Sequence, residues 1–139
     1  MASASAPPFV PPAIPWRQPQ ALPAVIDLGP GLDPVQLSNA LQRLCAEPGL
    51  LAVVVFGSRG RGEARSSSDL DLAVIVAEPT LTPQDKAACW SRCRERIGPL
   101  GVGVDLIVAG AADAERLSQS RWHVLGDVAR FGRVLYVAG

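Results

Sequence analysis

The stretch that decides the fold reads LLAVVVF at residues 50–56, GSRGRGEARSSS at 57–68 and DLDLAVIVA at 69–77. One apolar run ends in Gly-Ser and the next opens with Asp-x-Asp, which predicts two buried strands joined by a tight turn and a short loop. Side chains alternate between the two faces of a strand, so Asp69 and Asp71 share one face while the leucines beside them face the core. Two carboxylates are therefore expected close to a glycine turn.

This pair of carboxylates and the turn beside it predict a metal-assisted phosphate site. Neighbouring carboxylates repel each other and are costly unless a cation lies between them. Their oxygen atoms suit Mg²⁺, which takes waters and substrate phosphates as its other ligands. Gly57 would let the backbone approach a phosphate closely, and Ser58 offers a hydroxyl and an N–H. A helix that begins at Ser58 or Arg59 would point further N–H groups at that phosphate.

A third carboxylate, Asp105, lies in the run GVDLIV at residues 103–108, which otherwise predicts a buried strand. A lone aspartate in a core strand is costly unless it is paired or bound to a metal ion. The alternative is an aspartate at the end of the strand that faces solvent. On the first interpretation, Asp69, Asp71 and Asp105 together form the catalytic and metal-binding group.

Gly57-Ser58, ten further residues and then Asp69-x-Asp71 form a unit that resembles the nucleotidyltransferase superfamily typified by DNA polymerase beta. It is most similar to the small minimal nucleotidyltransferases, the MntA-type antitoxins of HEPN/MNT toxin–antitoxin pairs. Their signature is written around G-S-x-A-R-G and S-D-x-D-L, and this chain has GSRGRG at 57–62 and SDLDL at 68–72. Gly60 stands where that family usually has alanine. The resemblance covers roughly residues 34–137.

The resemblance implies an α/β domain with a mixed sheet of four or five strands, helices mainly on one face, and a palm-like core. It also implies a third acidic residue on a later strand, for which Asp105 is the best match. Asp69 and Asp71 would hold Mg²⁺ on the triphosphate, and with Asp105 they would hold a second ion near the acceptor hydroxyl. Asp105 could also accept the hydroxyl proton. The nucleotide-binding residues expected in the turn and loop are Gly57, Ser58, Arg59, Arg61 and Ser68.

The resemblance also implies ATP as the donor and adenylylation as the reaction. Small members of the family act as antitoxins that modify a tyrosine of a HEPN-type ribonuclease toxin, so a toxin partner is expected in a heteromeric complex. The chain is barely larger than the catalytic core, and the acceptor site is expected partly on that partner. Two alternatives stay open. One is a non-catalytic antitoxin that covers its partner, and the other is transfer to a small molecule such as an aminoglycoside.

Composition limits the class of protein further. The chain has 139 residues, 48% of them apolar, which suits one domain with a sizeable core. Its 13 basic and 13 acidic residues balance, which argues against an extended nucleic-acid footprint. No apolar run approaches the ~20 residues of a membrane span, and no signal peptide is evident. Three cysteines without a secretion signal indicate reduced thiols in the cytoplasm.

The chain is expected to divide into a proline-rich tail or arm at residues 1–23 and a nucleotidyltransferase domain at 24–139. Residues 1–23 hold seven of the 13 prolines, so they are either a disordered leader or an arm that docks on a partner or on its own core. Apolar periodicity and capping signals predict the elements of the domain. Helices are expected from residue 34 to a stop at Pro48-Gly49 and at 83–97, 111–118 and 121–131. Strands are expected at 50–56, 69–77, 102–108 and 133–137.

Overall fold

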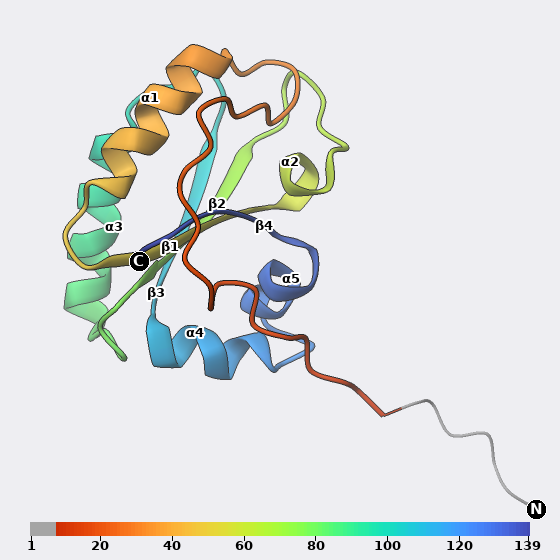
Figure 1. Cartoon of the computed structure of the whole chain (residues 1–139), viewed down its shortest axis with the longest axis vertical. Coiled ribbons are helices and arrows are strands. Elements are labelled where there is room, and N and C mark those ends of the chain that lie inside the picture. The colour runs from red at the N-terminus through yellow and green to blue at the C-terminus, as the bar shows by residue number, and fades with distance from the viewer. Residues whose placement is uncertain (1–7) are drawn as a thin grey trace, which may run out of the picture.

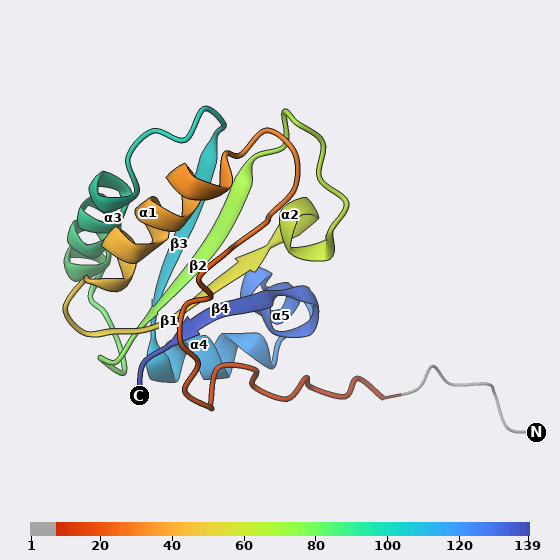
Figure 2. The ribbon, with the colours of Figure 1, turned by 45° about the horizontal axis from the view of Figure 1, so that its top comes forward.

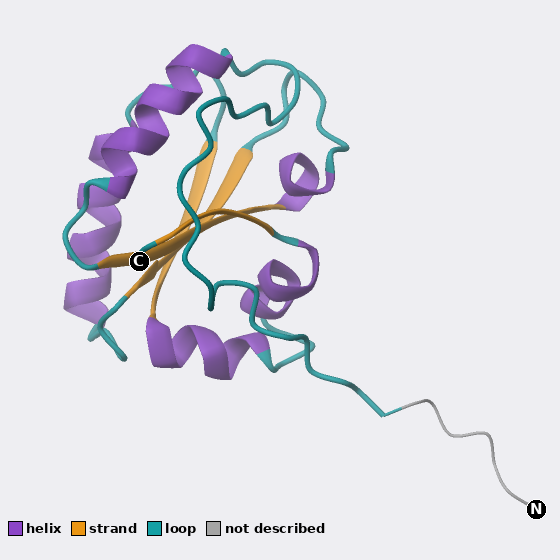
Figure 3. Ribbon diagram, viewed as in Figure 1, coloured by secondary structure: helices purple, strands orange, loops and turns teal. Residues whose placement is uncertain are grey.

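The computed structural model describes residues 8–139 and has a four-stranded sheet surrounded by helices (Figures 1 and 3). The elements are α1 (Pro34–Cys45), β1 (Leu50–Phe56), α2 (Gly57–Arg61), β2 (Leu70–Val76), α3 (Pro83–Ile97), β3 (Val104–Gly110), α4 (Ala111–Ser118), α5 (Val124–Phe131) and β4 (Arg133–Val137). The strand order is β3-β2-β1-β4. β2 and β3 run parallel, whereas β1 is antiparallel to both β2 and β4. The expected mixed sheet is confirmed.

Side-chain caps determine where the helices begin. The Asp33 carboxylate accepts the Gln36 N–H at 2.9 Å to start α1, and Thr82 Oγ1 accepts the Asp85 N–H at 3.1 Å to start α3. α5 begins three residues later than expected, because His123 Nδ1 accepts the Leu125 N–H and caps the helix there. Among residues 8–139, no helix is both long and apolar enough to cross a bilayer.

The helices form two layers, one on each face of the sheet (Figure 2). The longer helices α1 and α3 pack on one face, where Val53 and Val55 of β1 point into the larger core cluster. The shorter α4 and α5 cover the other face, where Val54 belongs to a second cluster. The alternation of the β1 valines between the two clusters is the period of a strand buried on both sides. The prediction that the helices lie mainly on one face therefore holds for the two longest helices. α4 and α5 form a smaller second layer on the other face.

The N-terminal arm, which in the structure comprises residues 8–33 ahead of α1, packs on the domain (Figure 1). Trp16 is only 3% exposed and lies in the core cluster beneath α5, while Ile26 and Leu28 lie in the cluster beneath α1. Gln20 pairs with Val137 of β4 through two main-chain hydrogen bonds of 3.0 and 2.9 Å. These contacts favour the alternative of an arm that docks on its own core. Residues 1–7 lie outside the described residues, and a domain boundary at residue 24 stays a prediction.

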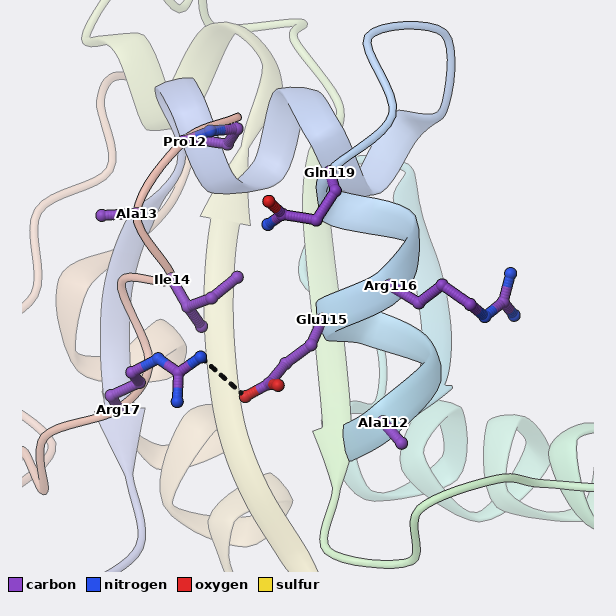
Figure 4. A pocket seen from close by; sticks show the side chains of 8 residues that line it. All are labelled: Pro12, Ala13, Ile14, Arg17, Ala112, Glu115, Arg116 and Gln119. Carbon is purple, nitrogen blue, oxygen red and sulfur yellow. Dashed lines mark ion pairs between the residues drawn. The ribbon is translucent and has the colours of Figure 1, made fainter. Parts of the chain in front are cut away.

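The arm also contacts α4 (Figure 4). Arg17 Nη2 lies 3.4 Å from Glu115 Oε1, and Ile14 points into the hollow between the arm and the helix. Both charged side chains are largely exposed, so this ion pair adds little stability. The hollow has a volume of about 640 Å³, and none of the predicted site residues lines it.

Candidate active site

Strand register brings the three aspartates to one end of the sheet. β2 and β3 run parallel, and Asp71 pairs directly with Asp105. The neighbouring β1 runs the other way and its last residue, Phe56, pairs with Asp71, so Gly57 follows at the same end. Asp69 precedes β2 by one residue. Two strand starts and one strand end thus meet where the sequence pattern predicted a site.

Asp71 is the central carboxylate of this group. Its pKa is raised to about 6, mainly by burial and in addition by interaction with the Asp105 carboxyl and repulsion from Asp69. The positive charge of Arg61 partly opposes the rise. Asp69 and Asp105 are exposed, whereas Asp71 is half-buried. Three carboxylates in this arrangement favour either a bound proton or a bound cation.

Gly57 allows the close contact between the turn and Asp71. Its φ of +67° lies in the left-handed region that favours glycine. A Cβ built on Gly57 would overlap Asp71 Oδ2. We expected glycine here because a larger residue would keep the backbone away from a phosphate. The structure adds a second reason, since the side chain of any other residue would collide with the Asp71 carboxylate.

Arg59 has a structural role in this structure, and its contacts do not support the prediction that it binds nucleotide. Its side chain is buried, at 2% exposure, directly behind the turn. The guanidinium donates five hydrogen bonds to main-chain carbonyl oxygens, those of Leu28, Pro30, Arg65 and, twice, Ser68. Arg59 thus joins the N-terminal arm to the loop between α2 and β2, and its donors are occupied.

The remaining nucleotide-binding candidates lie around the turn. Arg61 is exposed, donates to Glu63 at 3.1 Å and is close enough to influence the Asp71 carboxyl. Ser58 is half-buried in the first turn of α2. Ser68 Oγ accepts the Arg65 N–H at 2.8 Å, so this hydroxyl also holds the loop closed. Nucleotide binding by these residues stays a prediction.

The carboxylates fit Mg²⁺ better than a metal held by protein alone. Within residues 8–139, no group of three His, Cys, Asp or Glu side chains is close enough to hold an ion by itself. Mg²⁺ is commonly bound by one or two carboxylates, with substrate phosphates and waters completing its shell. The pairing of Asp71 with Asp105 across β2 and β3 brings two of these carboxylates side by side. Asp69, Asp71 and Asp105 stay the predicted metal ligands.

Cys89 and Cys93 are core residues rather than a second metal site. Both are buried in α3, with their sulfur atoms 3.9 Å apart. Burial raises the pKa of the Cys93 thiol to about 12, so it stays a neutral thiol. Both side chains belong to the larger core cluster and act as small packing residues.

Two features of the site were missed from sequence. Gly103 lies against Asp69, and a Cβ there would come within 2.5 Å of Asp69 Oδ1. A hollow of about 270 Å³ also adjoins Gly57, with Phe131 of α5 on its wall. The sequence did carry a signal for this contact, because a glycine in or beside a strand permits another chain segment to approach closely, and Gly103 directly precedes Val104-Asp105. Phe131 gave no such signal, because apolar periodicity predicted it on the buried face of its helix.

The pKa of Asp71 makes the stability of the metal-free protein depend on pH. Between about pH 4 and pH 6, the native carboxyl keeps its proton while an unfolded aspartate, with a pKa of ~3.9, has lost it. The unfolded state then binds fewer protons, so the melting temperature should fall as pH rises through this window. Asp71→Asn should flatten the fall in thermal melts without divalent ions. Asp33→Asn is the control, because asparagine caps a helix about as well as aspartate, and it should keep the dependence of melting temperature on pH. If Asp71→Asn keeps that dependence too, the raised pKa does not belong to Asp71.

Comparison with known proteins gives one family match and several similar folds. The family model described as nucleotidyltransferase domain matches residues 37–124, which include all three aspartates. A toxin–antitoxin structure with AMP-PNP is 21% identical over 72% of this chain and 73% of that chain, with a TM-score of 0.44. A candidate nucleotidyltransferase from Sulfolobus solfataricus is 19% identical over 78% and 93%, with a TM-score of 0.46. The toxin–antitoxin MntA-HepT is 17% identical over 76% and 74%, with a TM-score of 0.42. No curated protein sequence matches the chain.

Proposed function

Because the chain belongs to the nucleotidyltransferase-domain family, we propose that it transfers AMP from ATP to a hydroxyl of a partner protein, with Mg²⁺ as its metal. The proposed partner is a HEPN-type ribonuclease toxin modified on a tyrosine, which makes this chain its cytoplasmic antitoxin. The family match supports transferase activity with a nucleoside triphosphate and a divalent metal in general. The choice of AMP, tyrosine and toxin rests on the resemblance of the Gly57-Ser58 and Asp69-x-Asp71 motifs to minimal nucleotidyltransferases.

One observation carries the proposal, namely the meeting of Asp71 and Asp105 beside Gly57. The two residues are paired across the parallel strands β2 and β3, and Asp69 adds a third negative charge that acts on Asp71. Such a group is unfavourable when fully ionised, and a divalent cation with a triphosphate would relieve the repulsion. A merely structural aspartate would instead be expected to pair with a cationic side chain. The arrangement therefore supports catalysis over simple coverage of a partner.

The residues of the site can be given roles in the transfer. The acceptor oxygen attacks the α-phosphorus, the bond from that phosphorus to the pyrophosphate oxygen breaks, and the hydroxyl proton passes to Asp105. Asp105 suits this role because it is exposed at the start of β3. Asp69 and Asp71 would hold Mg²⁺, which when bound neutralises charge on the triphosphate and the leaving pyrophosphate.

The turn contributes positioning. The main-chain N–H groups of Gly57 and Ser58 at the start of α2 would donate to phosphate oxygens, and Arg61, whose charge acts on Asp71, would add positive charge beside them. Ser68 would act mainly by holding the loop closed. Positioning of this kind, rather than covalent chemistry by the protein, is the main requirement of phosphoryl transfer.

Charge favours a protein over a polynucleotide as the acceptor. The chain has 13 basic and 13 acidic residues and so no net charge. Polynucleotide binding draws most of its affinity from lysine and arginine side chains that neutralise phosphates. Binding of a protein that presents a hydroxyl does not require such a basic surface.

Intact-mass measurement of a HEPN-type partner tests the proposal. The full chain is incubated with the partner, ATP and Mg²⁺, and the partner is expected to gain one or more AMP units on a tyrosine. The gain should disappear with the double variant Asp69→Asn/Asp71→Asn, whereas Asp33→Asn should behave as the parent chain. If the parent chain binds and silences the partner without a mass change, inhibition is by coverage and the proposed transfer is wrong.

A further inference from the structure

A second hollow lies beside the carboxylates, between the turn that opens α2 and the exposed side of α5. Its volume is about 270 Å³. The residues that line it are Phe56, Gly57, Arg61, Val124, Asp127 and Phe131. It is distinct from the larger hollow of Figure 4, which lies between the arm and α4.

The wall formed by α5 is unusually apolar for a surface. Phe131 is 55% exposed and Val124 is 39% exposed, although Leu125 and Val128 of the same helix are buried. One apolar side of α5 thus packs on the core, and a second apolar side, with Val124 and Phe131, lines the hollow. Apolar walls with a few charged groups at the edge are typical of small-molecule sites.

The hollow is continuous with the proposed phosphate site. Gly57 lines the hollow and also contacts the Asp71 carboxylate. Arg61 lines the hollow too, and its charge acts on Asp71. A nucleotide whose phosphates lie at Gly57 and Ser58 would therefore have its base within reach of Phe131.

We propose that this hollow binds the adenine base of the donor nucleotide, stacked on Phe131, an inference that rests on the proposed function. An aromatic ring stacks on the face of a base, and Val124 would close the apolar wall. The Asp127 carboxylate can accept a hydrogen bond from the exocyclic amine that adenine carries. The site thus takes a nucleoside triphosphate through two separate contacts, phosphates at the turn and base at α5.

Calorimetric titration of the full chain in Mg²⁺ separates these contacts. The two probes are a non-hydrolysable ATP analogue and inorganic tripolyphosphate, which has no base. Phe131→Ala is expected to weaken binding of the analogue about tenfold, as loss of one stacked base does, and to leave tripolyphosphate binding unchanged. Phe131→Tyr should restore binding of the analogue. Trp122→Ala removes another exposed aromatic side chain, 87% exposed and outside the hollow, and should change neither affinity.

The possible results decide between the base site and its alternatives. Equal binding of both probes by the parent chain, or an equal effect of Phe131→Ala on both, would overturn the base site while leaving the phosphate site intact. If Phe131→Ala weakens only the binding of a partner protein, the hollow is a protein contact and the inference is wrong. A parent chain that binds neither probe would overturn the proposed function itself and the base site with it.

Discussion

Asp71→Asn is expected to reduce nucleotidyl transfer about a thousandfold or more, which corresponds to ~4 kcal/mol of transition-state stabilisation. Asparagine has nearly the shape of aspartate but supplies no negative charge to a metal ion. Asp71 lies between the Asp69 and Asp105 carboxylates, so its loss removes the central ligand of the proposed site. The fold should survive, because the substitution removes repulsion rather than a stabilising contact.

Two measurements separate this result from unfolding. Transfer of labelled AMP should be lost in Asp71→Asn, while its melting temperature at neutral pH without metal should equal or exceed that of the parent chain. Asp33→Asn provides the matched control, since it makes the same chemical change at a helix cap outside the site. Transfer within tenfold of the parent rate in Asp71→Asn would contradict the assigned role.

Local signals were sufficient to predict most of the fold. The pairs Asp33-Pro34 and Thr82-Pro83 each combine a side-chain cap with a proline in the first turn, and both helices begin there. The run at 50–56 is apolar throughout, and the β1 strand begins and ends at the predicted residues. Such signals act over three or four residues, so sequence alone could reveal them. The late start of α5 was missed because histidine is an uncommon cap.

Contacts between distant segments could not be predicted in the same way. Arg59 directly follows the Gly57-Ser58 motif, and an arginine at that position suggests a phosphate ligand. Its hydrogen-bond partners Leu28 and Pro30 are 31 and 29 residues away in the chain. The burial of Trp16 was left open for the same reason, since the prolines around it fitted a tail as well as a docked arm and the rest of its core cluster lies beyond residue 50. The shared face of Asp69 and Asp71 followed from strand periodicity, whereas the place of Asp105 beside them was implied only by the resemblance to the nucleotidyltransferases.

Arg59→Ala is expected to lower the free energy of unfolding by about 5 kcal/mol, since it removes five hydrogen bonds worth roughly 1 kcal/mol each. The total stability of a domain this size is about 5–15 kcal/mol, so the variant should be largely unfolded or close to it. Arg59→Lys should cost less but still destabilise, because an ammonium group offers three donors and cannot span the arm and the loop as the guanidinium does. Denaturant unfolding of both variants measures these losses.

Arg61→Ala and Arg65→Ala distinguish a structural arginine from a ligand. Both side chains are exposed in the same turn and loop, and their removal should change stability by less than about 1 kcal/mol. Arg61→Ala should weaken tripolyphosphate binding, whereas Arg65→Ala should leave both properties near those of the parent chain. If Arg59→Lys instead keeps the parent stability but loses tripolyphosphate binding, Arg59 is a phosphate ligand after all. The contrast depends on burial: a guanidinium enclosed by main-chain carbonyls can hold the arm in place but cannot also meet a triphosphate.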